Sequence, residues 1–155
     1  AAAGAHSVDP QVLEARRVGA GVGLFGVDFT SANLVQEAGL ETTAVSFDKG
    51  CYLGQETVAR VRYRGRVNRR LHCVSLDGPA TVGAELSAGD RSVGVLTSVV
   101  RTADHGVLGL AIVRREADDA SVLDVGGSDA HARLIRPPLQ NDHKPLVRIP
   151  PLGTS

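Results

Sequence analysis

The pattern of hydrophobic and polar residues changes near residue 57. From there to about residue 136, short valine-rich runs alternate with turn residues such as Asp77-Gly78-Pro79 and Gly126-Gly127. Short strands with turns at this spacing are typical of an antiparallel barrel or sandwich. We expect these strands within residues 66–77, 91–100, 106–114, 120–125 and 130–136.

Before residue 57 the pattern predicts helix and loop. Asp9-Pro10 favours a helix start, because Asp can accept amide hydrogens at the N-cap and Pro needs no donor at the first helical position. We expect this helix to run to about Val18 and to close at Gly19. A short helical turn is expected at residues 37–40.

Residues 19–30 form a glycine-rich, mostly apolar stretch. Gly21-x-Gly23-x-x-Gly26 matches the dinucleotide-binding fingerprint, but that fingerprint needs a strand before it and a helix after it. Here a predicted helix comes first and no helical pattern follows. The stretch is therefore interpreted as a tight loop whose backbone passes close to another surface.

These patterns predict an α+β protein that is mostly β. A small helical and loop N-terminal segment is followed by a C-terminal antiparallel β-barrel, with divisions at residues 1–61, 62–136 and 137–155. The last division holds five of the seven prolines, which exclude a helix or a central strand. We expect an extended, proline-rich tail there.

Composition excludes several classes of protein. The formal net charge is zero, so the whole molecule has no general attraction for nucleic acid or membrane. No apolar run approaches the roughly 20 residues that span a bilayer, and no signal peptide is recognisable. Two cysteines make no disulfide framework, which favours a cytosol or organelle matrix. The chain has no methionine, and we expect it to be part of a longer protein.

Residues 49–56, Lys-Gly-Cys-Tyr-Leu-Gly-Gln-Glu, concentrate the candidate chemistry. Lys49 and a helix beginning near Gly54 would both favour the thiolate of Cys51. A buried structural cysteine is the alternative, and spacing alone favours it. Cys73 lies in a strand-like run and is expected to fill the core. Without a Cys-x-x-Cys motif or a local histidine pair, no metal site is predicted.

Six arginines occur in eleven residues with no acidic residue among them. On an extended segment the first four would share one face, and arginine suits bidentate contact with carboxylate or phosphate. Candidate ligands are a polyglutamate tail, a phosphate or RNA. The alternative is a solvated face balanced by the acidic stretch 116–129. The four anion-binding candidates are Arg60, Arg62, Arg64 and Arg66.

The segment 49–56 resembles the Lys-Gly-Cys-Tyr-x-Gly-Gln-Glu signature of the YgfZ family. Flanking matches are Phe25-Gly26-x-Asp28 before it and Gly94-Val95-Leu96-Thr97-Ser98 after it. Members of this family are folate-binding proteins that help maintain or assemble iron–sulfur enzymes. They resemble the aminomethyltransferase, or T-protein, of the glycine cleavage system.

The resemblance implies that residues 1–61 end a folate-binding region whose N-terminal half is missing here. It implies tetrahydrofolate as cofactor, iron–sulfur proteins or their assembly factors as partners, and Cys51 as the functional thiol. The implied location is the bacterial cytosol or the mitochondrial matrix. Membrane partners are not expected, and the neutral charge disfavours RNA. Further candidates by resemblance are Lys49, Gly50, Tyr52, Gly54, Gln55, Glu56, Phe25 and Asp28.

One departure from the superfamily pattern concerns Gly19. T-proteins carry glutamate at this position, where it pairs with the amine and amide donors of the pterin, and glycine cannot do so. The leading hypothesis is therefore a folate-binding accessory protein for iron–sulfur enzymes, including those that modify tRNA. Folate-dependent one-carbon transfer and an RNA-binding barrel are the alternatives.

Overall fold

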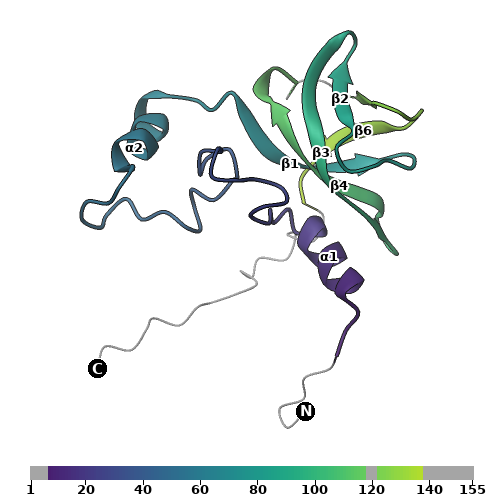
Figure 1. The fold of residues 1–155 in the computed structure, drawn as a ribbon, viewed down its shortest axis with the longest axis horizontal. Coiled ribbons are helices and arrows are strands. Elements are labelled where there is room, and N and C mark those ends of the chain that lie inside the picture. Colours follow the sequence, from purple (N-terminus) through teal and green to yellow (C-terminus); the bar gives the residue numbers. More distant parts are fainter. Residues whose placement is uncertain (1–6, 118–121, 138–155) are drawn as a thin grey trace.

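The computed structural model describes residues 7–117 and 122–137, and it shows two helices and a closed six-stranded antiparallel β-barrel (Figure 1). The mostly β, α+β class with a C-terminal barrel is thereby confirmed. Neighbouring strands follow the order β1-β4-β3-β2-β5-β6 around the barrel. The elements are α1 (Pro10–Gly19), α2 (Gln55–Arg64), β1 (Arg69–Leu76), β2 (Glu85–Ala88), β3 (Arg91–Thr102), β4 (Gly106–Arg114), the 3₁₀ turn η1 (Arg115–Ala117), β5 (Leu123–Val125) and β6 (His131–Ile135).

The barrel is filled by aliphatic side chains from alternate strand positions. On β4, Ala111 and Val113 point inward, whereas Leu108 and Leu110 point outward. The inward set is buried inside the barrel, and the outward set is buried because Val18 of α1 packs over it and over the neighbouring Cys73 of β1. The largest fully buried side chains are Leu86, Leu96, Leu108, Leu110, Leu123, Val18, Val74 and Val113.

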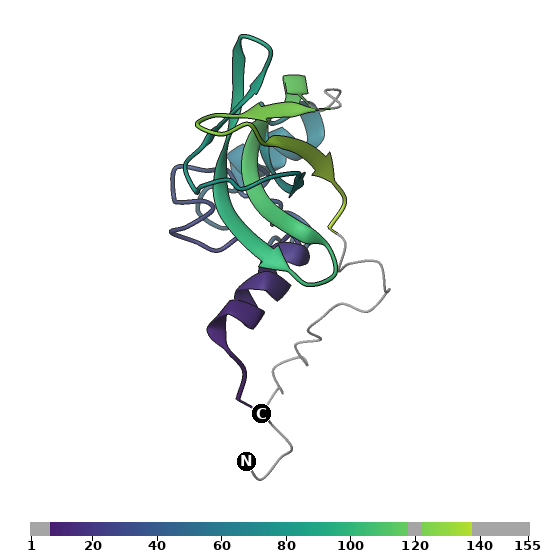
Figure 2. The ribbon, with the colours of Figure 1, turned by 90° about the vertical axis from the view of Figure 1, so that its right-hand side faces the viewer.

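Helix α1 forms where the sequence predicts it. The Asp9 side chain accepts a hydrogen bond from Gln11 N at 2.8 Å, and Arg16 and Arg17 occupy the last turn, where cations oppose the negative end of the helix dipole. The helix lies against one end of the barrel in both views (Figures 1 and 2). Its buried C-terminus therefore joins the glycine-rich loop directly to the barrel.

The glycine-rich loop passes close to β1, as predicted. A Cβ atom on Gly23 would lie 2.6 Å from Cδ2 of Leu71, so only glycine fits without displacing that side chain. Gly26 has a φ of 84°, a left-handed conformation that suits glycine. Turn and bend residues, not a helix, follow this loop up to residue 49, which agrees with rejecting a dinucleotide site.

Two local expectations differ from the structure. The helix expected to begin near Gly54 is present as α2, with Gly54 at its N-cap, but residues 55–64 do not adopt the extended conformation in which the arginines would share one face. Alternate residues of a helix point about 200° apart, and the arginines therefore do not form a single face. Strand β2 was not predicted, because its Glu-Leu-Ser-Ala sequence is too short to show a pattern.

The predicted division at residue 62 falls inside α2, and the first barrel strand starts at Arg69. Of the proline-rich tail, only Pro137 lies within the described residues, so the tail stays a prediction. Among the helices of the described part, none is long and apolar enough to cross a membrane.

Candidate functional site

The signature segment 49–56 lies on an arm between the turn at Leu40 and strand β1. Gln55 and Glu56, the last two residues of the signature, are the first two residues of α2. Figure 1 shows this helix set apart from the barrel. The described residues of α2, 55–63, are exposed or half-buried. Helices this short are marginal alone in water, so contacts at the two ends of the arm must hold it.

Cys51 is exposed to solvent. The interpretation as a buried structural cysteine is therefore wrong, and the thiol is accessible to a reactant. It lies four residues before the start of α2 at Gln55. It does not pair with Cys73, which is buried against Val18.

The residues around Cys51 hold one another in a compact turn. The Lys49 ammonium lies 5.0 Å from the centroid of the Tyr52 ring, a cation–π distance. Tyr52 N donates to the side-chain oxygen of Gln55 at 3.4 Å, and Gln55 N donates to the Tyr52 carbonyl at 3.2 Å. Gly54 has a φ of 86° at the N-cap, and Glu56 is in the first turn of α2.

Phe25 and Asp28 belong to a different part of the structure. The Asp28 carboxylate accepts four hydrogen bonds, from Arg17 at 2.5 Å, Leu24 N at 2.9 Å, Thr97 at 2.6 Å and Ser98 at 2.7 Å. These bonds occupy its acceptor positions and tie the glycine-rich loop to α1 and β3. Phe25 is 66% exposed and packs edge-on against Phe29, with 5.8 Å between ring centroids.

Arg17 is the centre of this buried network. It also donates to the Ser98 hydroxyl at 2.8 Å and pairs with Glu14. The hydrogen bond to Glu14 and the nearby Asp28 charge raise the pKa of Arg17. The same bond lowers the pKa of Glu14. The network therefore keeps these groups charged and fixes the loop that carries Phe25.

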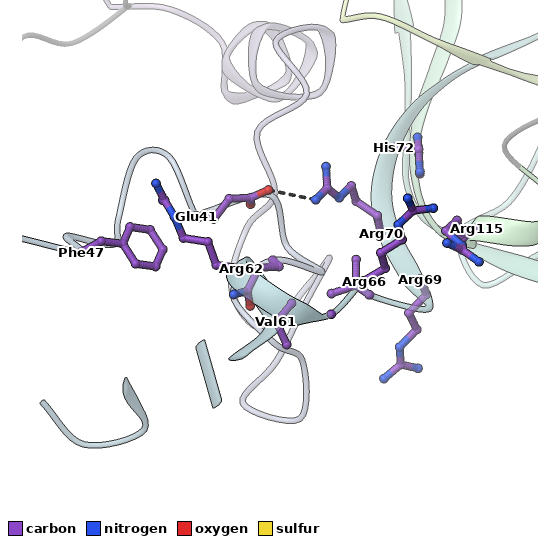
Figure 3. A pocket seen from close by; sticks show the side chains of 12 residues that line it. Glu41, Phe47, Val61, Arg62, Arg66, Arg69, Arg70, His72 and Arg115 are labelled. Carbon is purple, nitrogen blue, oxygen red and sulfur yellow. Dashed lines mark hydrogen bonds and ion pairs between the residues drawn. The ribbon is translucent and has the colours of Figure 1, made fainter. Parts of the chain in front are cut away.

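A pocket of about 450 Å³ lies between α2 and the barrel (Figure 3). The structure brings two of the four predicted anion-binding arginines into it. Arg60 does not line it, and the side chain of Arg64 is outside the described residues. The arginines of the lining are Arg62, Arg66, Arg69, Arg70 and Arg115.

Sequence reasoning did not assign Arg115 or His72 to this site. Arg115 follows β4, whose last residue Arg114 pairs with Arg69 at the start of β1. That strand register brings Arg115 beside the arginine cluster, and no local pattern reveals it. In the described part of the acidic stretch, Glu116 lies 3.8 Å from Arg91 and Asp124 lies 3.7 Å from His131, so these two carboxylates pair outside the cluster. Asp118 and Asp119 lie outside the described residues.

No three histidine, cysteine or carboxylate side chains of the described residues are grouped as a metal would require. The features that could react with or bind a ligand are therefore the exposed thiol of Cys51, the exposed ring of Phe25 and the arginine-lined pocket.

Comparisons with known proteins identify the barrel. Residues 68–140 match the family model described as CAF17, C-terminal beta-barrel domain. The tRNA-modifying protein YgfZ of Vibrio atlanticus is 41% identical over 83 residues, which cover 48% of this chain and 26% of that protein. The mitochondrial iron–sulfur cluster assembly factor IBA57 of Mus musculus is 40% identical over 80 residues, 46% of this chain and 21% of that protein.

A solved structure shows the same fold. Glycine cleavage system aminomethyltransferase T from Bartonella henselae matches with a TM-score of 0.68 at 18% identity, over 81% of this chain and 37% of that chain. The resemblance to the YgfZ-type family within the aminomethyltransferase fold is thus confirmed. The chain spans about a quarter of the length of the two curated relatives it matches.

Proposed function

Because the barrel of this chain belongs to the CAF17 C-terminal domain family, we propose that the protein is a folate-binding accessory factor. It supports the assembly or repair of iron–sulfur clusters, including those of enzymes that modify tRNA. The names of the YgfZ and IBA57 relatives support this assignment. Its partners are iron–sulfur proteins or their assembly factors.

The exposure of Cys51 within the signature is the observation that carries this proposal. The thiol is in solvent, two residues after Lys49 and four residues before the start of α2 at Gln55. We assign Lys49 and Glu56 the role of positioning the thiol. Tyr52, Gly54 and Gln55 hold the turn, and Gly50 leaves space beside it.

Tetrahydrofolate fits this chain in part. Exposed Phe25 offers an aromatic face for a flat ring, and arginines near α2, among them the predicted Arg60, Arg62, Arg64 and Arg66, suit the carboxylates of a glutamate tail. The amine and amide donors of the pterin find no free carboxylate at Gly19 or Asp28. Glycine has no side-chain acceptor, and the Asp28 carboxylate already accepts four hydrogen bonds. That partner would come from the N-terminal half, which would also cover exposed apolar residues such as Leu13.

Complementation with a Cys51→Ala variant tests the proposal. The complete gene is expressed in cells that lack it, and the activity of an iron–sulfur enzyme and the tRNA modification it makes are measured. We expect both to fall to the level of cells without the gene, because alanine has no thiol. Leu53→Ala is the matched control, as Leu53 is fully exposed in the same segment.

Full enzyme activity with Cys51→Ala would refute the role of the thiol. Equal loss with Leu53→Ala would also contradict it, because the segment would then act through shape and not through Cys51. Immunoblotting shows that each variant is present at the same level.

A further inference from the structure

We infer that the pocket between α2 and the barrel binds a small dianion that also carries an N–H or O–H donor, and that the bound ligand clamps α2 to the barrel. This inference rests on the pocket alone and does not depend on the role proposed for Cys51. Two sources of this chemistry are the glutamate end of a folate and a phosphate monoester whose organic part carries a hydroxyl.

The charge of the lining favours an anion. Five arginines line the pocket, with Glu41 as the acidic residue among them. Arg70 pairs with Glu41 at 2.9 Å, and Arg69 pairs with Glu37, which lies outside the lining, at 3.1 Å. Five positive charges against these two carboxylates leave three in excess. Arginines converging on a hollow create a positive potential that attracts anions.

Two buried acceptors indicate that the ligand also donates hydrogen bonds. Gln36 is 4% exposed and lines the pocket. Its Nε2 donates to the Val58 carbonyl at 2.9 Å, whereas its Oε1 has no hydrogen-bond partner among the described residues. Glu41 Oε2 is likewise buried without such a partner. Unpaired buried acceptors are costly, and a ligand N–H or O–H would satisfy them.

The shape of the pocket favours a small molecule over an RNA strand. Its volume of about 450 Å³ lies within the range of roughly 300–1,000 Å³ usual for small-ligand sites. Single-stranded RNA needs free aromatic faces for stacking. The Arg62 guanidinium covers the Phe47 ring at 3.7 Å from its centroid, so this ring is not free to stack.

One wall of the pocket comes from α2 on the arm, and the other comes from the barrel. Val61 and Arg62 belong to α2, whereas Arg70 and Arg115 belong to β1 and η1 (Figure 3). A dianion between them would neutralise charge on both walls at once. The described residues of α2 are at most half-buried, and Gln36 donates to the Val58 carbonyl of this helix. The ligand would add a link between α2 and the barrel to that hydrogen bond.

Isothermal titration at low salt tests the binding site. The probes are N-acetylglutamate and inorganic phosphate, with the uncharged diamide of N-acetylglutamate as control. We expect one or both dianions to bind and the diamide not to bind, and the stronger dianion identifies the source. Arg66→Ala and Arg115→Ala should each weaken binding roughly tenfold, as charge-assisted hydrogen bonds are lost. Arg101→Ala, on β3 outside the pocket, is the matched control.

Several results would overturn the site. These are no binding of either dianion, equal weakening by Arg101→Ala, or a short single-stranded RNA that binds far more tightly with a steep salt dependence. Amide hydrogen exchange tests the clamp separately. Residues 55–64 should exchange several-fold more slowly with saturating ligand, and unchanged exchange in the ligand-bound protein would refute the clamp.

Discussion

At the scale of single residues, the two cysteines have opposite environments. Cys51 is exposed on the arm, whereas Cys73 is 3% exposed beneath α1. Burial raises the pKa of the Cys73 thiol to about 11. The two cysteines thus differ in solvation, which the sequence around each of them does not show directly.

The Cys73 thiol should make stability fall at alkaline pH. In the unfolded chain this thiol ionises near its ordinary pKa of 9.0, and in the folded protein near 11. Its contribution is therefore fully present below pH 9 and is lost as the pH rises to 11, about 2–3 kcal/mol in all. Urea unfolding at several pH values measures this change.

Cys73→Ala should remove that part of the pH dependence, because alanine does not ionise. Cys51→Ala should keep it, since Cys51 is exposed. The same slope in wild type and Cys73→Ala would show that other groups cause the alkaline loss of stability.

Gly94 on β3 is required by close packing of the barrel backbone. A Cβ there would lie 2.7 Å from the Ile112 carbonyl oxygen on β4. We expect Gly94→Ala to lower the free energy of unfolding by about 1–3 kcal/mol, because overpacking forces the backbone to shift. Gly50→Ala is the control, since nothing lies within 4 Å of its Cβ position. Equal stability of the two variants by urea unfolding would contradict this.

At the scale of elements, the molecule joins a well-packed barrel to two less-packed attachments. Helix α1 and the glycine-rich loop are tied to β3 through the buried network of Arg17, Asp28 and Ser98. The arm with α2 is held through Gln36 and the arginine pairs at the base of β1. The second attachment therefore depends on polar contacts that water can replace.

Removing Asp28 should loosen α1 and the loop from the barrel. Asp28→Ala leaves the guanidinium of Arg17, whose side chain is 13% exposed, without its buried partner. Breaking such a pair costs about 3–5 kcal/mol. Thermal or urea unfolding should show this loss, with Asp104→Ala in an exposed turn as control. A loss below 1 kcal/mol, roughly the value of an exposed ion pair, would refute the structural importance of the network.

At the scale of the whole molecule, the chain shares the fold of an aminomethyltransferase but has glycine at the position where the resemblance leads us to expect glutamate. The barrel and the segments before it match aminomethyltransferase T over 81% of this chain. Yet Gly19, buried at the end of α1, offers no carboxylate to a pterin. A shared fold does not by itself establish a shared reaction.

The complete protein should not transfer an aminomethyl group. It is incubated with an aminomethyl donor and tetrahydrofolate, and methylenetetrahydrofolate is measured. We expect none above background, whereas a T-protein under the same conditions gives product. Turnover by this protein would establish the one-carbon transferase alternative and overturn the accessory role.

Much of the fold was predictable because its signals are local. The Asp9-Pro10 pair predicted α1, and alternating valine-rich runs with turn residues predicted most of the barrel strands. Strand β2 was missed because four residues show no periodicity. The helix beginning near Gly54 was predicted, whereas the single arginine face considered for an extended segment does not form, because residues 55–64 are helical.

The sequence by itself determined the barrel class, the signature segment and the identity of its thiol, since these depend on neighbouring residues. Only the tertiary structure decided that Cys51 is exposed, that Asp28 is saturated by Arg17 and β3, and that Arg115 joins Arg62 around one pocket. Burial and convergence depend on which distant segments meet. Barrel closure and strand register determine which distant segments come into contact, and the local sequence pattern does not show this.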